Sequence, residues 1–217
     1  MPEVSSEFVA RMEDVLDVYQ QAHDPACPVV TFDEHSAQLV SETRQPIPAQ
    51  PGQRERVDYE YEREGTANLF EFFQPLAGWR QIKVTTRRTK LDFAHCMKEL
   101  VDVHFPNAIK IKIVLDNLNT HVVSSLYEAF SPVEALRIAR KLEFHYTPKH
   151  GSWLNMTEIE FSILSRQALN RRIPDRDTLT RIVNAWQSQR NAAHATIHWH
   201  FTPDLARTKL ASLYPSI

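Results

Sequence analysis

Two short apolar runs, each of which leads into an aspartate, constrain the fold of this chain more than any other feature. Residues 29–32 are β-branched or aromatic and lead into Asp33. Residues 110–115 alternate lysine with isoleucine, end in an apolar run and lead into Asp116. Short runs of this composition are typical of buried strands. The sequence therefore predicts two core strands that each deliver a carboxylate.

Other segments have the composition of strands or of the turn between them. Apolar and charged residues alternate across residues 57–62, which predicts a strand with one face in water. Residues 68–73 and 80–86 supply two more strands around a turn at 75–78, and together these segments suggest an antiparallel meander. A short fifth strand is expected at residues 142–146.

Apolar residues at three- and four-residue spacing predict several amphipathic helices. Pro132 suits a helix start and Asp175 suits an N-cap, so these two residues mark boundaries. Three prolines and a glycine between Glu42 and Gln53 predict an extended loop that lets the chain reverse. The predicted helices span residues 5–21, 91–105, 120–130, 132–141, 154–169 and 175–193.

The order of these elements matches an α/β architecture, the ribonuclease H-like fold. This fold has a mixed five-stranded sheet, with three antiparallel and two parallel strands, flanked by helices. In it Asp33 ends the first strand, Asp116 ends the fourth, and Glu158 lies on the helix after the fifth. Because the first and fourth strands are neighbours at the sheet centre, we expect the three acids to meet at one edge.

Three acidic side chains on rigid elements fit the chemistry of phosphodiester transfer. In that chemistry two Mg²⁺ ions about 3.5 to 4 Å apart clamp the attacking and leaving oxygens of an in-line displacement. Mg²⁺ is a hard ion that binds carboxylates, phosphate oxygens and water. Taken singly, Asp33 or Asp116 is more often a loop residue or helix cap, and Glu158 a solvated helix residue. Their joint placement favours metal ligands.

Two neighbouring acids compete for these roles. Glu34 follows Asp33, but successive strand side chains point to opposite faces, so only one of the two reaches the site. Glu160 lies about 200° around the helix from Glu158 and does not share its direction. Asn155 lies three residues before Glu158 and on the same helix face. The pattern therefore favours Asp33 and Glu158.

The chain resembles a known family in four motifs, and the resemblance covers nearly all of it from about residue 29. The motifs are TFDEHS (31–36), IVLDNLNTH (113–121), HYTPKHGSWLNMTEIEFSIL (145–164) and RNAAHATIHWHFTPDLARTKL (190–210). As a combination they resemble the DDE transposases of bacterial insertion sequences related to the mariner group. Met156 and Thr157 stand where many relatives have proline and a small aliphatic residue, which is conservative for geometry.

The resemblance implies a fold, an activity and a set of partners. It implies a ribonuclease H-like catalytic domain that hydrolyses DNA at transposon ends and then joins the freed 3′ hydroxyl to target DNA. Carried over residue by residue, Asp33, Asp116 and Glu158 become the catalytic triad and bind two Mg²⁺ ions, for which Mn²⁺ can substitute. The expected partners are DNA and a second copy of the chain in the active complex.

The resemblance also divides the chain. We expect an N-terminal helix and linker at residues 1–27 and the DDE catalytic domain, with its C-terminal helices, at 28–217. Such transposases recognise their terminal repeats with an N-terminal helix-turn-helix region, which a single helix before residue 29 cannot form. We therefore expect a catalytic half of a truncated or split reading frame, with recognition of transposon ends elsewhere.

Five residues near the triad are candidates for positioning a metal ligand or contacting DNA. Asn117 and His121 follow Asp116 closely, although Asn117 suits equally well the cap of the next helix. Lys149 and Trp153 lie on the loop before the Glu158 helix, where a cation and a stackable ring suit a DNA strand. Ordinary core packing is the alternative for Trp153. Asn155 completes the set.

Composition narrows the remaining alternatives. Two cysteines outside any CxxC pair and no long apolar run predict a cytoplasmic protein without disulfides. The formal charge of −2 argues against strong DNA binding through an excess of lysine and arginine. We therefore expect another domain to provide most of the affinity for DNA. A catalytically silent remnant that pairs with full-length transposase, or a host nuclease that does not join strands, are the alternative functions.

Overall fold

The centre of the molecule is a mixed five-stranded sheet of order β3-β2-β1-β4-β5. A computed structural model describes residues 5–54, 56 and 58–215. β1 pairs with β2, and β2 with β3, in antiparallel fashion, whereas β4 runs parallel to β1 and β5 parallel to β4. This confirms the predicted ribonuclease H-like sheet. The strands are β1 (Val29–Glu42), β2 (Tyr61–Gln74), β3 (Trp79–Thr85), β4 (Ile111–Leu115) and β5 (Leu142–Tyr146).

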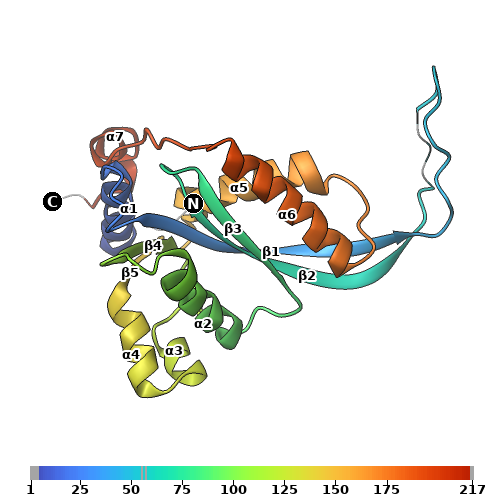
Figure 1. The fold of residues 1–217 in the computed structure, drawn as a ribbon. Helices are drawn as coiled ribbons and strands as arrows, with labels where there is room; N and C mark the ends of the chain where they lie inside the picture. The colour runs from blue at the N-terminus through green and yellow to red at the C-terminus, as the bar shows by residue number, and fades with distance from the viewer. Residues whose placement is uncertain (1–4, 55, 57, 216–217) are drawn as a thin grey trace.

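Helices cover both faces of the sheet (Figure 1). The α2, α3 and α4 group lies on one side, α5 and α6 lie on the other, and α1 packs against α7 at one end. A 3-10 turn (Ser152–Leu154) precedes α5, and π-helical turns extend α2 (Leu100–His104) and α5 (Ser165–Leu169). The helices are α1 (Ser6–Gln20), α2 (Lys90–Glu99), α3 (Ser124–Ala129), α4 (Pro132–Lys141), α5 (Met156–Leu164), α6 (Arg176–Ala192) and α7 (Pro203–Lys209), and a final 3-10 turn spans Ala211–Leu213.

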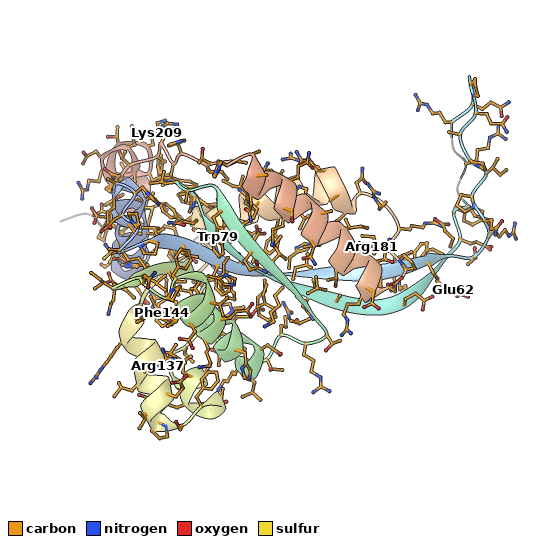
Figure 2. The ribbon with its side chains drawn as sticks, viewed as in Figure 1. Glu62, Trp79, Arg137, Phe144, Arg181 and Lys209 are labelled. Atoms are coloured by element: carbon orange, nitrogen blue, oxygen red, sulfur yellow. The ribbon has the colours of Figure 1, made fainter. Side chains whose placement is uncertain are left out.

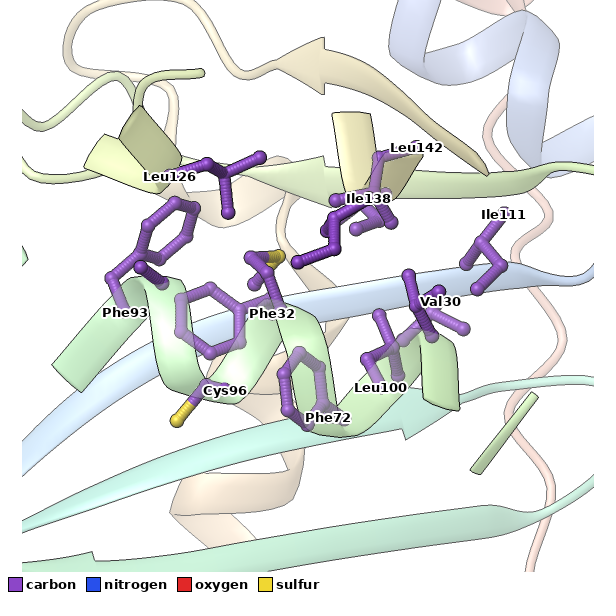
Figure 3. Close-up of a cluster of buried hydrophobic side chains, with 14 of the residues drawn as sticks. Val30, Phe32, Phe72, Phe93, Cys96, Leu100, Ile111, Leu126, Ile138 and Leu142 are labelled. Atoms are coloured by element: carbon purple, nitrogen blue, oxygen red, sulfur yellow. The ribbon is translucent and has the colours of Figure 1, made fainter. Parts of the chain in front are cut away.

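The core between the sheet and α2 to α4 fixes which way the side chains of β1 point (Figure 3). Phe32 is fully buried there, and its ring meets the rings of Phe72 and Phe93 at centroid distances of 4.9 and 5.6 Å. Each such ring stabilises the fold by roughly 1.5–3 kcal/mol through burial. Because side chains alternate along a strand, Thr31 and Asp33 face the opposite side, toward α5.

The other face of the sheet is sealed by α5 and α6. Its apolar cluster includes Leu69, Ile82, Phe161 and Leu179, all buried. At its edge Gly78 has a φ of +65°, and a Cβ there would lie 2.5 Å from the carbonyl carbon of His194. Only glycine lets the turn between β2 and β3 approach the end of α6 this closely.

β1 and β2 are longer than predicted, and Asp33 lies inside β1 rather than at its end. The two strands pair without interruption from Thr31 opposite Phe73 to Glu42 opposite Tyr61, apart from one bulge. Cross-strand hydrogen bonds therefore carry both strands beyond their apolar residues. The separate strand predicted at 57–62 is wrong, because β2 begins only at Tyr61; Val57 lies outside the described residues.

An arm connects the two long strands and projects from the sheet (Figure 1). It corresponds to the predicted extended loop, and two isolated bridges, Ile47 with Arg56 and Gln50 with Gln53, hold its two sides together. Figure 2 shows Glu62 at the end of the sheet from which the arm leaves. At this root Arg172 donates hydrogen bonds to the carbonyls of Asp58 and Glu60.

Most of the predicted helices are present with shifted ends. The helix expected at 120–130 is shorter and spans only Ser124–Ala129, whereas Asp175 caps α6 as predicted. The sequence predicted no helix at Pro203–Lys209, where α7 lies. Ala206 of this helix packs against α1 in a second core cluster. Neither cysteine is in a disulfide, and no helix in the described ranges has the length and apolarity that crossing a bilayer requires.

Candidate active site

Asp33 occupies the centre of the candidate site. The residue is 9% exposed, and its Oδ1 accepts a hydrogen bond from the backbone N–H of Glu34 at 2.8 Å. Asn155 Nδ2 donates to the other oxygen at 3.1 Å. Burial raises the pKa of Asp33 to about 7, and the negative charges of Asp116 and Glu158 add to the rise. The three acids therefore interact electrostatically.

Asp116 follows β4 directly, as predicted, and is held by a buried histidine. His121 Nδ1 lies 2.5 Å from Asp116 Oδ1, and His121 Nε2 lies 2.9 Å from Glu34 Oε1. Burial opposes a charge on this imidazole, but the hydrogen bonds to both carboxylates outweigh it and raise its pKa to about 9. His121 is thus protonated at neutral pH and fixes the direction of the Asp116 carboxylate.

Glu158 lies in the first turn of α5 and is exposed. The helix begins here because Asn155 caps it, accepting a hydrogen bond from the N–H of Thr157 at 3.1 Å. The hydroxyls of Thr157 and Thr31 lie 2.6 Å apart and tie the first turn to β1. Asn155 therefore has two roles, since the same side chain starts the Glu158 helix and donates to Asp33.

The triad satisfies part of what a divalent metal requires. The carboxylates are hard oxygen donors, and a bound cation would relieve the repulsion that adds to the effect of burial on the pKa of Asp33. Two of the three acids are engaged with Asn155 and His121. Within the part of the chain that the structure describes, no three His, Cys, Asp or Glu side chains already form a group that could hold a metal ion. That the triad binds metal stays a prediction.

The two rival acids point elsewhere and have other partners. Glu34 faces the α2 side of the sheet and binds His121, so it supports Asp116 from behind. Glu160 is fully buried and forms ion pairs with Arg80 and Arg190. Strand alternation and helical phase gave their directions, but their partners are distant in sequence and were not predicted.

The accessory candidates have different positions. Asn117 is exposed in a loop and does not cap the next helix, because α3 begins at Ser124 with Val123 as its N-cap. Lys149 is exposed on the loop that leads to α5. Trp153 is 44% exposed, so core packing does not account for it. Its ring stacks on Trp199 at 6.5 Å and meets Phe201 edge-on at 6.0 Å.

A comparison with protein families gives a match over most of the chain. Residues 28–180 match the model of a family described as DDE superfamily endonuclease. The chain belongs to this superfamily. A sequence comparison with curated proteins gives no match.

Solved structures of one transposase share the fold of this DDE domain. The paired-end complex of Mos1 transposase with the left transposon end gives a TM-score of 0.61 at 14% identity, covering 98% of this chain and 64% of that chain. The Mos1 strand transfer complex gives 0.61 at 13%, covering 100% and 64%. The catalytic domain of Mos1 mariner transposase gives 0.60 at 10%, covering 100% and 98%. The DDE domain thus spans about two thirds of the length of the Mos1 chains in the complexes.

Proposed function

We propose that this chain is the catalytic domain of a DNA transposase that cuts DNA at transposon ends and joins the ends to target DNA. The observation that carries the proposal is the match of residues 28–180 to the DDE superfamily endonuclease family. The charges of Asp116 and Glu158, which add to the rise in the pKa of Asp33, support it. Complexes of Mos1 with transposon ends, with Mn and with Mg support a DNA substrate and a divalent cofactor. We propose two Mg²⁺ ions, replaceable by Mn²⁺, and a homodimer as the active form.

In the proposed function the triad binds the metal, and neighbouring groups hold the triad in place. Asp33, Asp116 and Glu158 would hold the divalent cations, which would lower the pKa of bound water and stabilise the charge on the reacting phosphate. Asn155 and the backbone N–H of Glu34 hold the Asp33 carboxylate. His121 holds Asp116 from the buried side, and its positive charge offsets part of the repulsion among the acids.

The test is nicking of supercoiled plasmid with Mg²⁺, with Mn²⁺ and with EDTA. We expect nicking with either metal and none with EDTA. Joining of a pre-cut transposon end to a target plasmid distinguishes a transposase from a host nuclease, which would nick but not join. A chain that does neither with any divalent metal would be the silent remnant.

The raised pKa of Asp33 predicts a pH dependence for metal binding. A protonated carboxyl does not bind Mn²⁺, so binding must release a proton below pH about 7. We expect the Mn²⁺ affinity to rise about tenfold per pH unit between about pH 5.5 and 7 and then to level off. Without metal, the proton on Asp33 stabilises the folded state at low pH, and this contribution is lost as pH rises through 7.

The measurement is the increase in melting temperature that Mn²⁺ produces at each pH. The matched variant is Asp33→Asn, whose side chain does not titrate, and its response to Mn²⁺ should be small and independent of pH over this range. A wild-type profile without a rise toward pH 7 would show that metal binding displaces no proton from Asp33 in this range.

Trp153 predicts a contribution to DNA binding. Stacking of a base on an aromatic ring contributes about 1–3 kcal/mol, so Trp153→Ala is expected to weaken binding of DNA with a single-stranded end about tenfold. Fluorescence anisotropy of a labelled oligonucleotide measures this. The control is Tyr127→Ala, which removes a similarly exposed ring from α3. Equal DNA affinities for wild type and Trp153→Ala would show that the Trp153 ring does not contribute to DNA binding.

A further inference from the structure

A buried group of charges lies behind the helix that carries Glu158. Arg80 of β3 and Glu160 of α5 are fully buried, and Arg190 of α6 is 18% exposed at its side chain. Arg80 Nε lies 2.9 Å from Glu160 Oε2, and Arg190 donates to both Glu160 oxygens at 2.8 and 3.2 Å. We call Arg80, Glu160 and Arg190 the buried ion cluster. It connects α5 to a strand and to another helix through one carboxylate.

The cluster is also anchored at its own base. Arg80 donates to Asn191 Oδ1 at 3.2 Å and to the carbonyl of Ala195 at 2.6 Å. Asn191 returns a hydrogen bond from its Nδ2 to the backbone carbonyl of Arg80 at 2.8 Å. These hydrogen bonds hold the Arg80 guanidinium in place independently of its contact with Glu160.

Glu160 and Glu158 point to nearly opposite sides of α5, because two residues advance a helix by about 200°. Glu158 makes no side-chain hydrogen bond with the residues that the structure describes, so its direction depends on the rotation of α5 about its axis. A rotation of about 20° would move a side-chain atom some 5–6 Å from the axis by about 2 Å. Displacements of about 1 Å already impair catalysis.

Stability alone does not explain a buried ion cluster in a protein core. Apolar residues of similar volume often stabilise as well or better. A bidentate guanidinium differs from apolar residues in that it fixes the plane and the direction of the carboxylate that it binds. The neighbouring Glu71 is buried without a hydrogen-bond partner among the described residues, and burial raises its pKa well above the usual range.

We propose that Glu160, held by Arg80 and Arg190, is a positioning residue that fixes the rotation of α5 and thereby directs Glu158 at the metal site. The inference rests on the proposed function, in which Glu158 is a metal ligand. Thr157 and Asn155 secure the same helix on its β1 side. Glu160 secures it on the side away from Glu158, which completes the restraint on rotation.

The test is Glu160→Gln, which keeps the shape and removes the charge. We expect the affinity for Mn²⁺, measured without DNA by electron paramagnetic resonance of free Mn²⁺, to fall about 10- to 100-fold. In the nicking assay kcat should fall while KM for DNA stays the same, and raising the Mn²⁺ concentration should recover the rate. Arg190→Lys keeps a charge but loses the bidentate contact, so an intermediate loss is expected.

Two controls separate this role from loss of stability and from failure of the proposed function. Leu179→Ala removes buried apolar contacts of α6 without touching the cluster; it should lower the melting temperature and leave the Mn²⁺ affinity unchanged. Asp116→Asn should lose Mn²⁺ binding, and if it binds as wild type does, the proposed function itself is wrong. If Asp116→Asn loses binding while Glu160→Gln and Arg190→Lys retain it, only the positioning role is overturned. Should Glu160→Gln not fold, Arg190→Lys decides.

Discussion

Asp116→Asn is expected to reduce metal-dependent nicking of supercoiled DNA by about a thousandfold or more. Asparagine has the same shape as aspartate but offers a neutral oxygen, which binds a hard divalent cation far more weakly. The affected interaction acts on the charge that develops at the phosphate, where single-residue losses cost about 10²- to 10³-fold or more in rate. The measurement is the initial rate of open-circle formation at saturating Mg²⁺.

A matched control for Asp116→Asn exists at the surface. Asp14 of α1 also bonds a histidine, with its Oδ2 2.8 Å from His145 Nδ1. Asp14→Asn makes the same chemical change at a second aspartate and histidine pair, and it should nick DNA as wild type does. In Asp116→Asn the new side-chain amide still offers an oxygen to His121, so the melting temperature should fall only slightly. Equal nicking by Asp116→Asn and wild type would rule out the proposed mechanism.

The sequence predicted those features of the site that depend on local pattern. Asp116 follows a short apolar run, and β4 ends at Leu115. The N-cap role of Asp175 and the strand at Leu142–Tyr146 likewise depend on neighbours in the chain. Helical phase separated Glu158 from Glu160 because 3.6 residues per turn is a property of the helix alone.

Contacts between distant residues could not be predicted in the same way. His121 bonds Glu34, 87 positions away, and Glu160 pairs with Arg80 across α5 and β3. Periodicity states which way a side chain points but not which residue it meets. The length of β1 was also missed, because its outer half is held by pairing with β2 rather than by burial. Strand pairing of this kind overrides composition.

The buried ion cluster leads to the second large effect, which concerns stability. Arg80→Met is expected to lower the free energy of unfolding by about 3–5 kcal/mol. The variant leaves Glu160 facing Arg190 alone and removes the donor from the carbonyl of Ala195. Urea denaturation measures the loss. The control is Arg137→Met on α4, on the opposite side of the sheet from α6 (Figure 2). Arg137 pairs with Asp102 at a surface where such pairs contribute about 1 kcal/mol or less.

A double variant tests why Arg80→Met lowers the free energy of unfolding. An uncompensated charge on Glu160 and the loss of other contacts of Arg80 predict different stabilities for it. If the cost arises from leaving the Glu160 carboxylate undercompensated, then removing both groups in Arg80→Met with Glu160→Leu removes the cause. Arg190 is partly exposed and can reach water when its partner is gone. We expect the double variant to be about 1–3 kcal/mol more stable than the sum of the two single changes predicts. Strict additivity would mean that Arg80 acts through its contacts outside Glu160, which are the carbonyl of Ala195 and the ring of Phe73, whose centroid lies 5.0 Å from the guanidinium carbon.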